Sequence, residues 1–174
     1  MKKCLIVVDY QNDFVDGSLG FGKAKELDGR IARRIKAYKD GGDDVIFTFD
    51  THRSDYPDTI EGKNLPIVHC LKGTHGHLLY GQVALTFDEE KDVCFEKETF
   101  PSLELAEYLK GKEYRSVELC GLVSHICVLS NAVMVKAALP NTPIWIDREL
   151  TESYDESLQE AAFQVLRGLH IEIR

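Results

Sequence analysis

Short apolar runs alternate along the chain with segments whose apolar residues recur at helical spacing. The runs lie at 4–8, 45–49, 93–95, 117–120, 144–146 and 170–173. The run at 4–8 is continuously apolar, which is typical of a strand buried on both faces of a parallel sheet, and the segment 170–173 is expected to form an edge strand. Between them, the helical spacing predicts helices at 27–38, 103–109, 125–138 and 158–166.

This alternation predicts the fold class. Strands that are separated by helices form parallel sheets with helices on both faces, so we expect a three-layer α/β/α sandwich with a six-stranded, mostly parallel, doubly wound sheet. No repeat, low-complexity tract or linker interrupts the pattern, which predicts a single domain over 1–174. A long irregular stretch is expected from Asp50 to about Gly81. Ser153 and Glu156 have the spacing of a capping box for the last helix.

Composition narrows the class of protein. The 174 residues include 29 Asp and Glu against 21 Lys and Arg, a formal charge of −8, and 44% are hydrophobic. The acidic balance argues against nucleic-acid and membrane-surface partners. Neither a signal peptide nor a membrane-spanning run is recognisable, and the five cysteines form no CxxC pair. We therefore expect a cytoplasmic protein with reduced thiols.

Chemically capable side chains fall where the predicted strands end. Asp9 ends the first strand, Asp50 the second, and Lys97 follows the third, while Gly121 leads from the fourth strand to Cys127. In open parallel sheets, ligands bind outside the carboxyl ends of the strands. The sequence therefore predicts a site at this edge.

Cys127 is the candidate nucleophile, in Gly121-Leu-Val-Ser-His-Ile-Cys127. At the start of a helix, the dipole favours thiolate and backbone N–H groups can hold an oxyanion. The alternative interpretation is a buried structural cysteine, which we expect for Cys4, Cys94 and Cys120 inside strands.

A thiol that attacks a carbonyl group needs a base, and Asp9 can serve because burial at the end of an apolar strand would raise the pKa of its carboxyl group. Lys97 could balance that charge. The local sequence, Phe95-Glu-Lys-Glu, fits a solvated lysine at least as well.

Asp50-Thr-His52 places a carboxylate and an imidazole on the same side of a strand end, and His69 follows in the long loop. Two histidines and one carboxylate suit a catalytic transition metal. Glu61 could add a fourth ligand. The remaining loop histidines are expected elsewhere: His75 and His77 on the surface, and His125 at the pocket mouth.

Five segments together resemble the isochorismatase-like cysteine hydrolases and, within them, the nicotinamidases. The similarity covers nearly the whole chain. The matching segments are Val8-Asp-Tyr-Gln-Asn-Asp-Phe14, Thr48-Phe-Asp-Thr-His52, His69-Cys-Leu-Lys-Gly-Thr74, Phe95-Glu-Lys97 and Gly121-Leu-Val-Ser-His-Ile-Cys-Val128.

The resemblance implies an Asp–Lys–Cys triad, which falls on Asp9, Lys97 and Cys127. It also implies a cis peptide at Leu122–Val123, with the N–H groups of Val123 and Cys127 forming the oxyanion hole. Cys127 would attack a small-molecule amide, release ammonia and leave a thioester that water hydrolyses.

In this family, the implied divalent metal is zinc, iron or manganese, with zinc preferred. Asp50, His52 and His69 would hold it, and in nicotinamidases it binds the pyridine nitrogen of the substrate.

Beside the triad, the resemblance places a substrate pocket, which we assign to Phe14, Leu122, Val123 and Ile126. Core packing explains Phe14 equally well.

Two departures from the family pattern bear on the substrate. The third histidine of some nicotinamidases is missing from Arg53-Ser-Asp-Tyr-Pro57, so Glu61 would replace it. Pro66 stands where an aromatic residue often sandwiches the substrate ring.

The leading hypothesis is therefore a nicotinamidase that forms a homo-oligomer. One alternative is an amidohydrolase of the same family that acts on another small amide or carbamoyl compound, and another is a non-catalytic α/β binding module.

Overall fold

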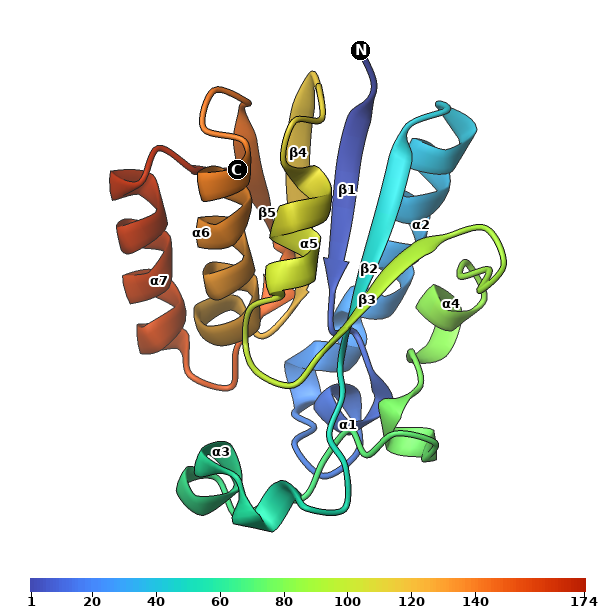
Figure 1. The fold of residues 1–174 in the computed structure, drawn as a ribbon, viewed down its shortest axis with the longest axis vertical. Helices are drawn as coiled ribbons and strands as arrows, with labels where there is room; N and C mark the ends of the chain where they lie inside the picture. The colour runs from blue at the N-terminus through green and yellow to red at the C-terminus, as the bar shows by residue number, and fades with distance from the viewer.

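The computed structural model describes all residues 1–174, and it is built on one sheet of six parallel strands (Figure 1). The strand order is β3-β2-β1-β4-β5-β6, so the chain winds outward from β1 to one edge and then from β4 to the other. The all-parallel sheet confirms the predicted fold class. The strands are β1 (Lys3–Val8), β2 (Asp44–Asp50), β3 (Val93–Lys97), β4 (Ser116–Leu122), β5 (Ile144–Glu152) and β6 (Glu172–Ile173).

Alternate residues of β1 face the two outer layers. Cys4, Ile6 and Val8 belong to a buried cluster with α5 (Leu103–Leu109), α6 (Leu129–Ala138) and α7 (Glu156–Gly168). Leu5 and Val7 belong to a second cluster with α2 (Asp28–Asp40) and α4 (Gly81–Ala84). A strand that is buried on both faces explains the continuous apolar run in the sequence.

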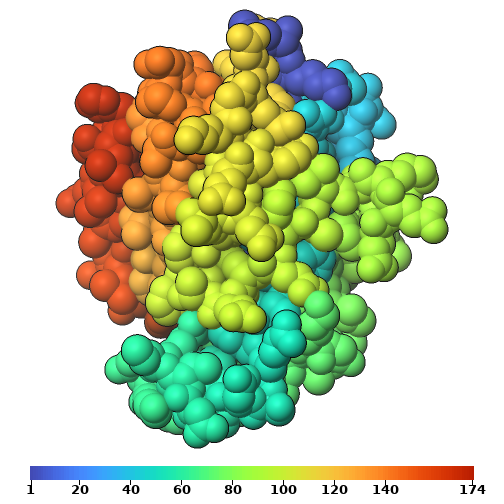
Figure 2. All heavy atoms as spheres, viewed as in Figure 1, coloured from blue at the N-terminus to red at the C-terminus, as the bar shows by residue number.

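The carboxyl end of the sheet carries most of the irregular chain. Between β2 and β3, the segment 51–92 forms short helices, and its first part makes the lower lobe of the molecule in Figure 2. The predicted irregular stretch therefore contains local turns of helix. Besides α4, the short helices at this end are α1 (Asn12–Val15), η1 (Gly22–Leu27), η2 (Tyr56–Asp58), α3 (Ile60–Asn64) and η3 (His75–His77).

The predicted helix at 125–138 begins with a wider turn. Residues 124–128 form η4 (Ser124–Val128), a π-helical turn that leads directly into α6. Gly121, just before it, has φ +109, and a Cβ atom there would lie 2.0 Å from the Val8 carbonyl oxygen. Only glycine allows β4 to approach β1 this closely at the point where the two halves of the sheet diverge.

Two local predictions are wrong. Cys94 is exposed, because β3 is an edge strand that pairs only with β2. The cap of α7 is Asp155, whose side chain accepts a hydrogen bond from the Leu158 N–H, and Ser153 does not cap the helix. None of the helices has the length and apolar character needed to cross a membrane.

Candidate active site

Three of the predicted site residues meet at the carboxyl ends of β1, β3 and β4. Lys97 Nζ lies 2.6 Å from Asp9 Oδ2 and 3.7 Å from Cys127 Sγ, and it donates a hydrogen bond to the Thr99 carbonyl oxygen at 3.0 Å. All three members are buried. Lys97 is therefore not the solvated lysine that its glutamate neighbours suggested.

Asp9 occupies a left-handed backbone conformation, with φ +46, immediately after β1. Its N–H donates to the Thr48 carbonyl oxygen at 3.2 Å, and the Thr48 hydroxyl donates to Asp9 Oδ1 at 2.7 Å. The second carboxylate oxygen, Oδ2, faces Lys97. The neighbouring strand β2 thus orients the carboxylate from one side, and β3 supplies the cation on the other.

The buried side chains of Asp9 and Lys97 shift each other's pKa values. Burial raises the pKa of the Asp9 carboxyl group, while Lys97 opposes that shift. Burial opposes the charge on Lys97, but Asp9 and the other acidic groups around it hold its pKa above the ordinary value. A lysine that stays charged next to a carboxyl group with raised affinity for protons suits proton transfer at Asp9.

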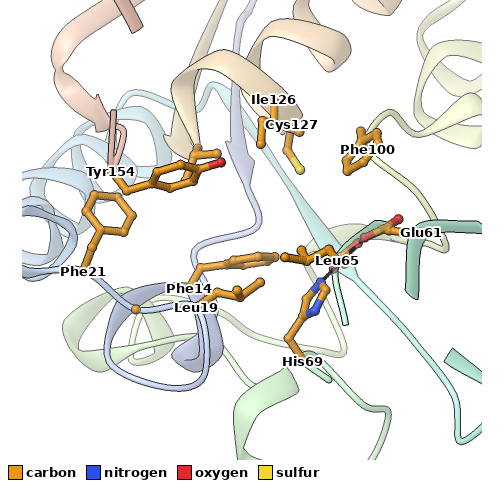
Figure 3. Close-up of a pocket in the computed structure, with 13 residues that line it drawn as sticks. Phe14, Leu19, Phe21, Glu61, Leu65, His69, Phe100, Ile126, Cys127 and Tyr154 are labelled. Carbon is orange, nitrogen blue, oxygen red and sulfur yellow. Dashed lines mark ion pairs between the residues drawn. The ribbon is translucent and has the colours of Figure 1, made fainter. Parts of the chain in front are cut away.

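Cys127 points into a cavity from η4 (Figure 3). Burial raises the pKa of its thiol well above the ordinary 9.0, and the negative charges of Asp9 and Asp50 raise it further, while Lys97 acts in the opposite direction. Desolvation therefore opposes the thiolate that a helix dipole favours, so that a base beside the thiol is needed to remove its proton.

The turn before Cys127 has an unpaired donor. The Leu122–Val123 peptide is cis, as the family resemblance implies. The Val123 N–H makes no hydrogen bond within the protein. Val123 also lines the cavity, whereas Leu122 is fully buried in the core and does not line it. Leu122 is therefore not a pocket residue.

Asn131 holds the nucleophile turn in place. Its side-chain NH2 group donates to the Cys127 carbonyl oxygen at 2.8 Å and to that of Phe100 at 3.1 Å, and its Oδ1 accepts from the Ser102 N–H at 2.9 Å. This fully buried amide connects the turn of the nucleophile to the loop that follows Lys97.

The four predicted metal ligands also converge. One ligand atom from each of Asp50, His52, Glu61 and His69 lies within 4.8 Å of all the others. Asp50 Oδ2 is 3.0 Å from His52 Nε2 and 3.2 Å from His69 Nε2, and Glu61 Oε1 is 3.5 and 3.7 Å from the same two nitrogens.

This group fits a cation. Asp50 Oδ2, His52 Nε2 and Glu61 Oε2 are buried and have no hydrogen-bond partner, which is rare outside functional sites. His69 Nδ1 is 2.8 Å from the Ile67 carbonyl oxygen, a contact that places the proton on Nδ1 and leaves Nε2 free as a ligand. Two imidazoles and two carboxylates are a donor set for zinc, iron or manganese.

The two clusters share Asp50. Its Oδ1 accepts a hydrogen bond from Lys97 Nζ at 3.2 Å, while Oδ2 faces the histidines. Although burial favours its neutral form, Lys97 and the histidines lower the pKa of Asp50. Burial also opposes charge on His52, but Asp50 and Glu61 raise its pKa to about 9. The carboxylates of Asp50 and Glu61 thus favour a positive charge between the four ligand side chains.

The cavity beside Cys127 has a volume of about 400 Å³ and is mostly apolar. Phe14 and Ile126 line it, in agreement with their predicted positions. Figure 3 shows Glu61 and His69 on one side and the Phe21 and Tyr154 rings on the other. Sequence analysis missed six lining residues, which all come from loops: Leu19, Gly20, Phe21, Leu65, Phe100 and Tyr154.

The sequence held a signal for one of these residues. Phe100 follows Lys97 by three positions, and an aromatic residue just beyond a strand end faces the site edge. Leu65, next to Pro66, lines the wall where an aromatic residue was missing.

The other histidines lie outside this group. His77 is buried, contrary to expectation, with Nε2 2.8 Å from the Thr51 hydroxyl oxygen. His75 is exposed as expected. His125 does not line the cavity; its Nδ1 is 2.8 Å from the Ser153 hydroxyl, and its ring packs against Tyr154.

Comparison with known proteins agrees with this arrangement. Residues 3–173 match the Isochorismatase domain family. The chain belongs to the isochorismatase family. A family member from Bacillus subtilis (strain 168), named an uncharacterized isochorismatase family protein PncA, is 32% identical over 143 residues, which cover 76% of this chain and 78% of that protein.

Solved structures of the isochorismatase fold superpose over the whole chain. The nicotinamidase/pyrazinamidase PncA from Bacillus subtilis is 27% identical, with a TM-score of 0.88 and 99% of each chain covered. The pyrazinamidase of Pyrococcus horikoshii in complex with zinc is 23% identical, with a TM-score of 0.84 over 100% of this chain and 99% of that one. At 23% identity, the similarity to the Pyrococcus horikoshii protein shows only that the two proteins share a fold.

Proposed function

We propose that this isochorismatase-family protein is a cysteine amidohydrolase that converts nicotinamide and water to nicotinate and ammonia. The observation that carries the proposal is the position of Lys97 Nζ, 2.6 Å from a buried carboxylate and 3.7 Å from a thiol that opens into a cavity. The Bacillus subtilis protein that shares the fold at 27% identity is a nicotinamidase/pyrazinamidase, which supports this substrate.

The chemistry begins with the protonated thiol. Asp9 takes the proton from Cys127 as the sulfur forms a bond to the amide carbon, so no free thiolate is needed beforehand. The N–H groups of Val123 and Cys127 stabilise the oxyanion of the tetrahedral intermediate. Lys97 stays charged throughout and balances Asp9.

Collapse of the intermediate breaks the C–N bond. Asp9 gives its proton to the departing nitrogen, ammonia leaves, and a thioester joins the acyl group to Cys127. Asp9 then removes a proton from a water molecule that attacks the thioester, and this proton passes to the sulfur as nicotinic acid leaves; the acid loses its remaining proton to solvent or ammonia and becomes nicotinate. Each proton that Asp9 accepts is returned in the same half-reaction.

Asp50, His52, His69 and Glu61 are proposed to hold a divalent metal, with zinc preferred. Such an ion supplies a Lewis-acidic position for the pyridine nitrogen of the substrate. With the ion held there, the carboxamide of the substrate would face Cys127, and the apolar walls exclude water from the thiol.

The cavity lining favours an aromatic amide over the alternative carbamoyl substrates. No lysine or arginine lines it, so the positive charge available to a substrate carboxylate would be that of the metal ion, which is proposed to bind the ring nitrogen instead. Phe14, Leu65 and Phe100 instead present apolar surface to a flat ring. Carbamoylated amino acids should therefore be poor substrates.

The decisive experiment measures ammonia release from a panel of nicotinamide, pyrazinamide, benzamide and carbamoylated amino acids. Nicotinamide is expected to be turned over, and Cys127→Ala should abolish its turnover. Full activity in Cys127→Ala would contradict the triad. Turnover of carbamoyl compounds alone would favour the other family activity, and no turnover by a folded protein would favour a binding module.

We also propose that the protein is a cytoplasmic homo-oligomer. The five cysteines form no disulfide, in agreement with a reducing compartment. Side chains on the outer helices leave apolar surface exposed, including Val133, Leu158 and Val165. Light scattering coupled to gel filtration will give the mass in solution, and a monomer of 19.7 kDa would contradict the assembly.

A further inference from the structure

Gln11 is a fully buried amide that touches neither the cavity nor any proposed catalytic atom. Its Oε1 accepts a hydrogen bond from the Asp50 N–H at 2.8 Å. Its Nε2 donates to the Asp50 carbonyl oxygen at 2.9 Å and to the His77 carbonyl oxygen at 2.8 Å. One side chain therefore pairs with both backbone groups of the residue that links the metal group to the triad.

The need for this amide follows from the end of β1. The register of β1 with β2 ends at Val8 and Thr48, and the chain then turns away at Asp9. On the other side of β2, the Thr51 N–H still donates to the Lys97 carbonyl oxygen at 2.8 Å. The backbone groups of Asp50 face the side that β1 has left, where they would be buried without partners. The side chain of Gln11 takes the place of the missing strand.

This pairing fixes the backbone from which the Asp50 carboxylate projects. Gln11 holds the backbone on one side, and Lys97 pairs with the adjoining residue on the other, so the Asp50 backbone cannot shift without breaking a buried hydrogen bond. Its Oδ1 remains 3.2 Å from Lys97 Nζ, while Oδ2 remains within 3.2 Å of both histidines. The position of Asp50 Oδ2, the oxygen that would bind a cation, therefore depends on Gln11.

A second side chain from the same segment acts on the other ligand loop. Asp13 Oδ2 accepts a hydrogen bond from the Cys70 N–H at 2.7 Å. Cys70 follows His69 directly and has φ +46, a conformation that a non-glycine residue needs support to keep. By contrast, Asn12 donates to the His75 carbonyl oxygen at 2.7 Å, away from the four ligands.

We propose that Gln11 is a positioning residue that presets the metal ligand Asp50 while keeping the same carboxylate in contact with Lys97. The inference rests on the metal site of the proposed function, and not on the identity of the substrate. Loss of the Gln11 amide should weaken metal binding by about 10- to 100-fold, the usual effect of removing a group that orients a ligand.

The test compares Gln11→Met, which keeps the size of the side chain but removes its three hydrogen bonds, with Asn12→Ala as the matched control. The zinc dissociation constant of the metal-free protein is measured by competition with a chromogenic chelator, and thermal unfolding of the same samples reports folding. Gln11→Met should bind zinc about 10- to 100-fold more weakly, and Asn12→Ala within about 2-fold of wild type. The KM for nicotinamide should rise more than kcat falls.

A second variant, Gln11→Glu, keeps the acceptor for the Asp50 N–H and decides the question if Gln11→Met does not fold. Its carboxylate cannot donate to the two carbonyl oxygens, so weaker zinc binding is again expected. Unchanged zinc affinity in a folded Gln11 variant with a lowered unfolding temperature would overturn the positioning role. A wild-type protein that binds no zinc would overturn the metal site as well, whereas normal zinc binding without nicotinamide turnover contradicts only the substrate.

Discussion

Two clusters of buried charge lie against the same sheet and differ in how completely they are paired. On the α2 face, Glu118 of β4 accepts hydrogen bonds from Arg34 and, at 2.6 Å, from the Tyr38 hydroxyl. Arg34 also pairs with Asp147 at 2.8 Å. At the carboxyl edge of the sheet, three buried atoms of the metal-ligand group have no hydrogen-bond partner: Asp50 Oδ2, His52 Nε2 and Glu61 Oε2.

The contrast shows that burial of charge alone does not mark a functional site. Glu118 is almost completely buried and shifted in pKa, yet no side-chain polar atom of its cluster is left over for a ligand. The edge cluster holds charges whose remaining atoms point at a common position and into a cavity. Incomplete pairing is what distinguishes a site that binds from an ion pair that stabilises.

The largest expected effect is on catalysis at the edge cluster. Asp9→Asn keeps the shape of the side chain but removes the base, so kcat/KM for nicotinamide should fall by about 10⁴-fold, as in other enzymes that lose one member of a triad. The free energy of unfolding should change much less than catalysis does, because the buried Lys97 keeps Asp50 as a charged partner. Ammonia release and urea unfolding measure the two effects. Substantial retained activity would remove the distinction between the clusters.

The next effect concerns the four ligands. Chelation of the metal should raise KM for nicotinamide by about 100-fold, because an anchor worth about 2.7 kcal/mol is lost. Zinc added back should restore activity. Variants of the Glu118 cluster should respond to the chelator as wild type does. Turnover that survives thorough metal removal would contradict the anchoring role.

A substitution in the Glu118 cluster should lower stability and leave catalysis nearly unchanged. Arg34→Met leaves Glu118 without its cation and should lower the free energy of unfolding by about 2 kcal/mol. This is less than for a fully buried pair, because Arg34 is 33% exposed. The kcat/KM of the folded enzyme should stay within about 2-fold of wild type. Lys39 lies on the same helix as Arg34 and pairs with Asp92, which precedes β3. Lys39→Met therefore serves as a control for the loss of a cation from α2.

The smallest effect is a pH dependence of stability. Burial raises the pKa of Glu118 above 4.5, although Tyr38 and Arg34 oppose the shift. A group with a raised pKa in the folded state stabilises the protein below the unfolded pKa, and this contribution is lost as pH rises through the folded value. Wild type should therefore lose stability relative to Glu118→Gln as pH rises above about 4.5. Urea midpoints across pH test this, and parallel profiles for the two proteins would contradict it.

The residues that sequence analysis located best are those at strand ends. Asp9, Asp50, Lys97 and Cys127 were placed at one edge because parallel strands direct their carboxyl ends the same way. The local sequence left the pairing of Lys97 with Asp9 as one of two interpretations, because the pairing depends on the order of the strands in the sheet.

Features that depend on how the loops pack could not be predicted from the sequence. The rings of Phe21 and Tyr154 form one wall of the cavity although they are far apart in the chain. Ser153 has the spacing of a helix cap, but its hydroxyl contacts His125, and Asp155 caps the helix instead. Likewise, the raised pKa of Cys127 follows from desolvation by the surrounding fold, which a helix position cannot report.

The cation of the triad stands on an edge strand of the sheet. β3 pairs with β2 alone, and Cys94 and Glu96 are exposed along it. An edge strand of five residues can open locally at a lower free energy than the whole domain unfolds. Each opening withdraws Lys97 from Asp9 and Asp50 and leaves two buried carboxylates facing each other. Catalytic competence is therefore tied to a local equilibrium, and amide hydrogen exchange in 93–97 would report the fraction of molecules that have lost it.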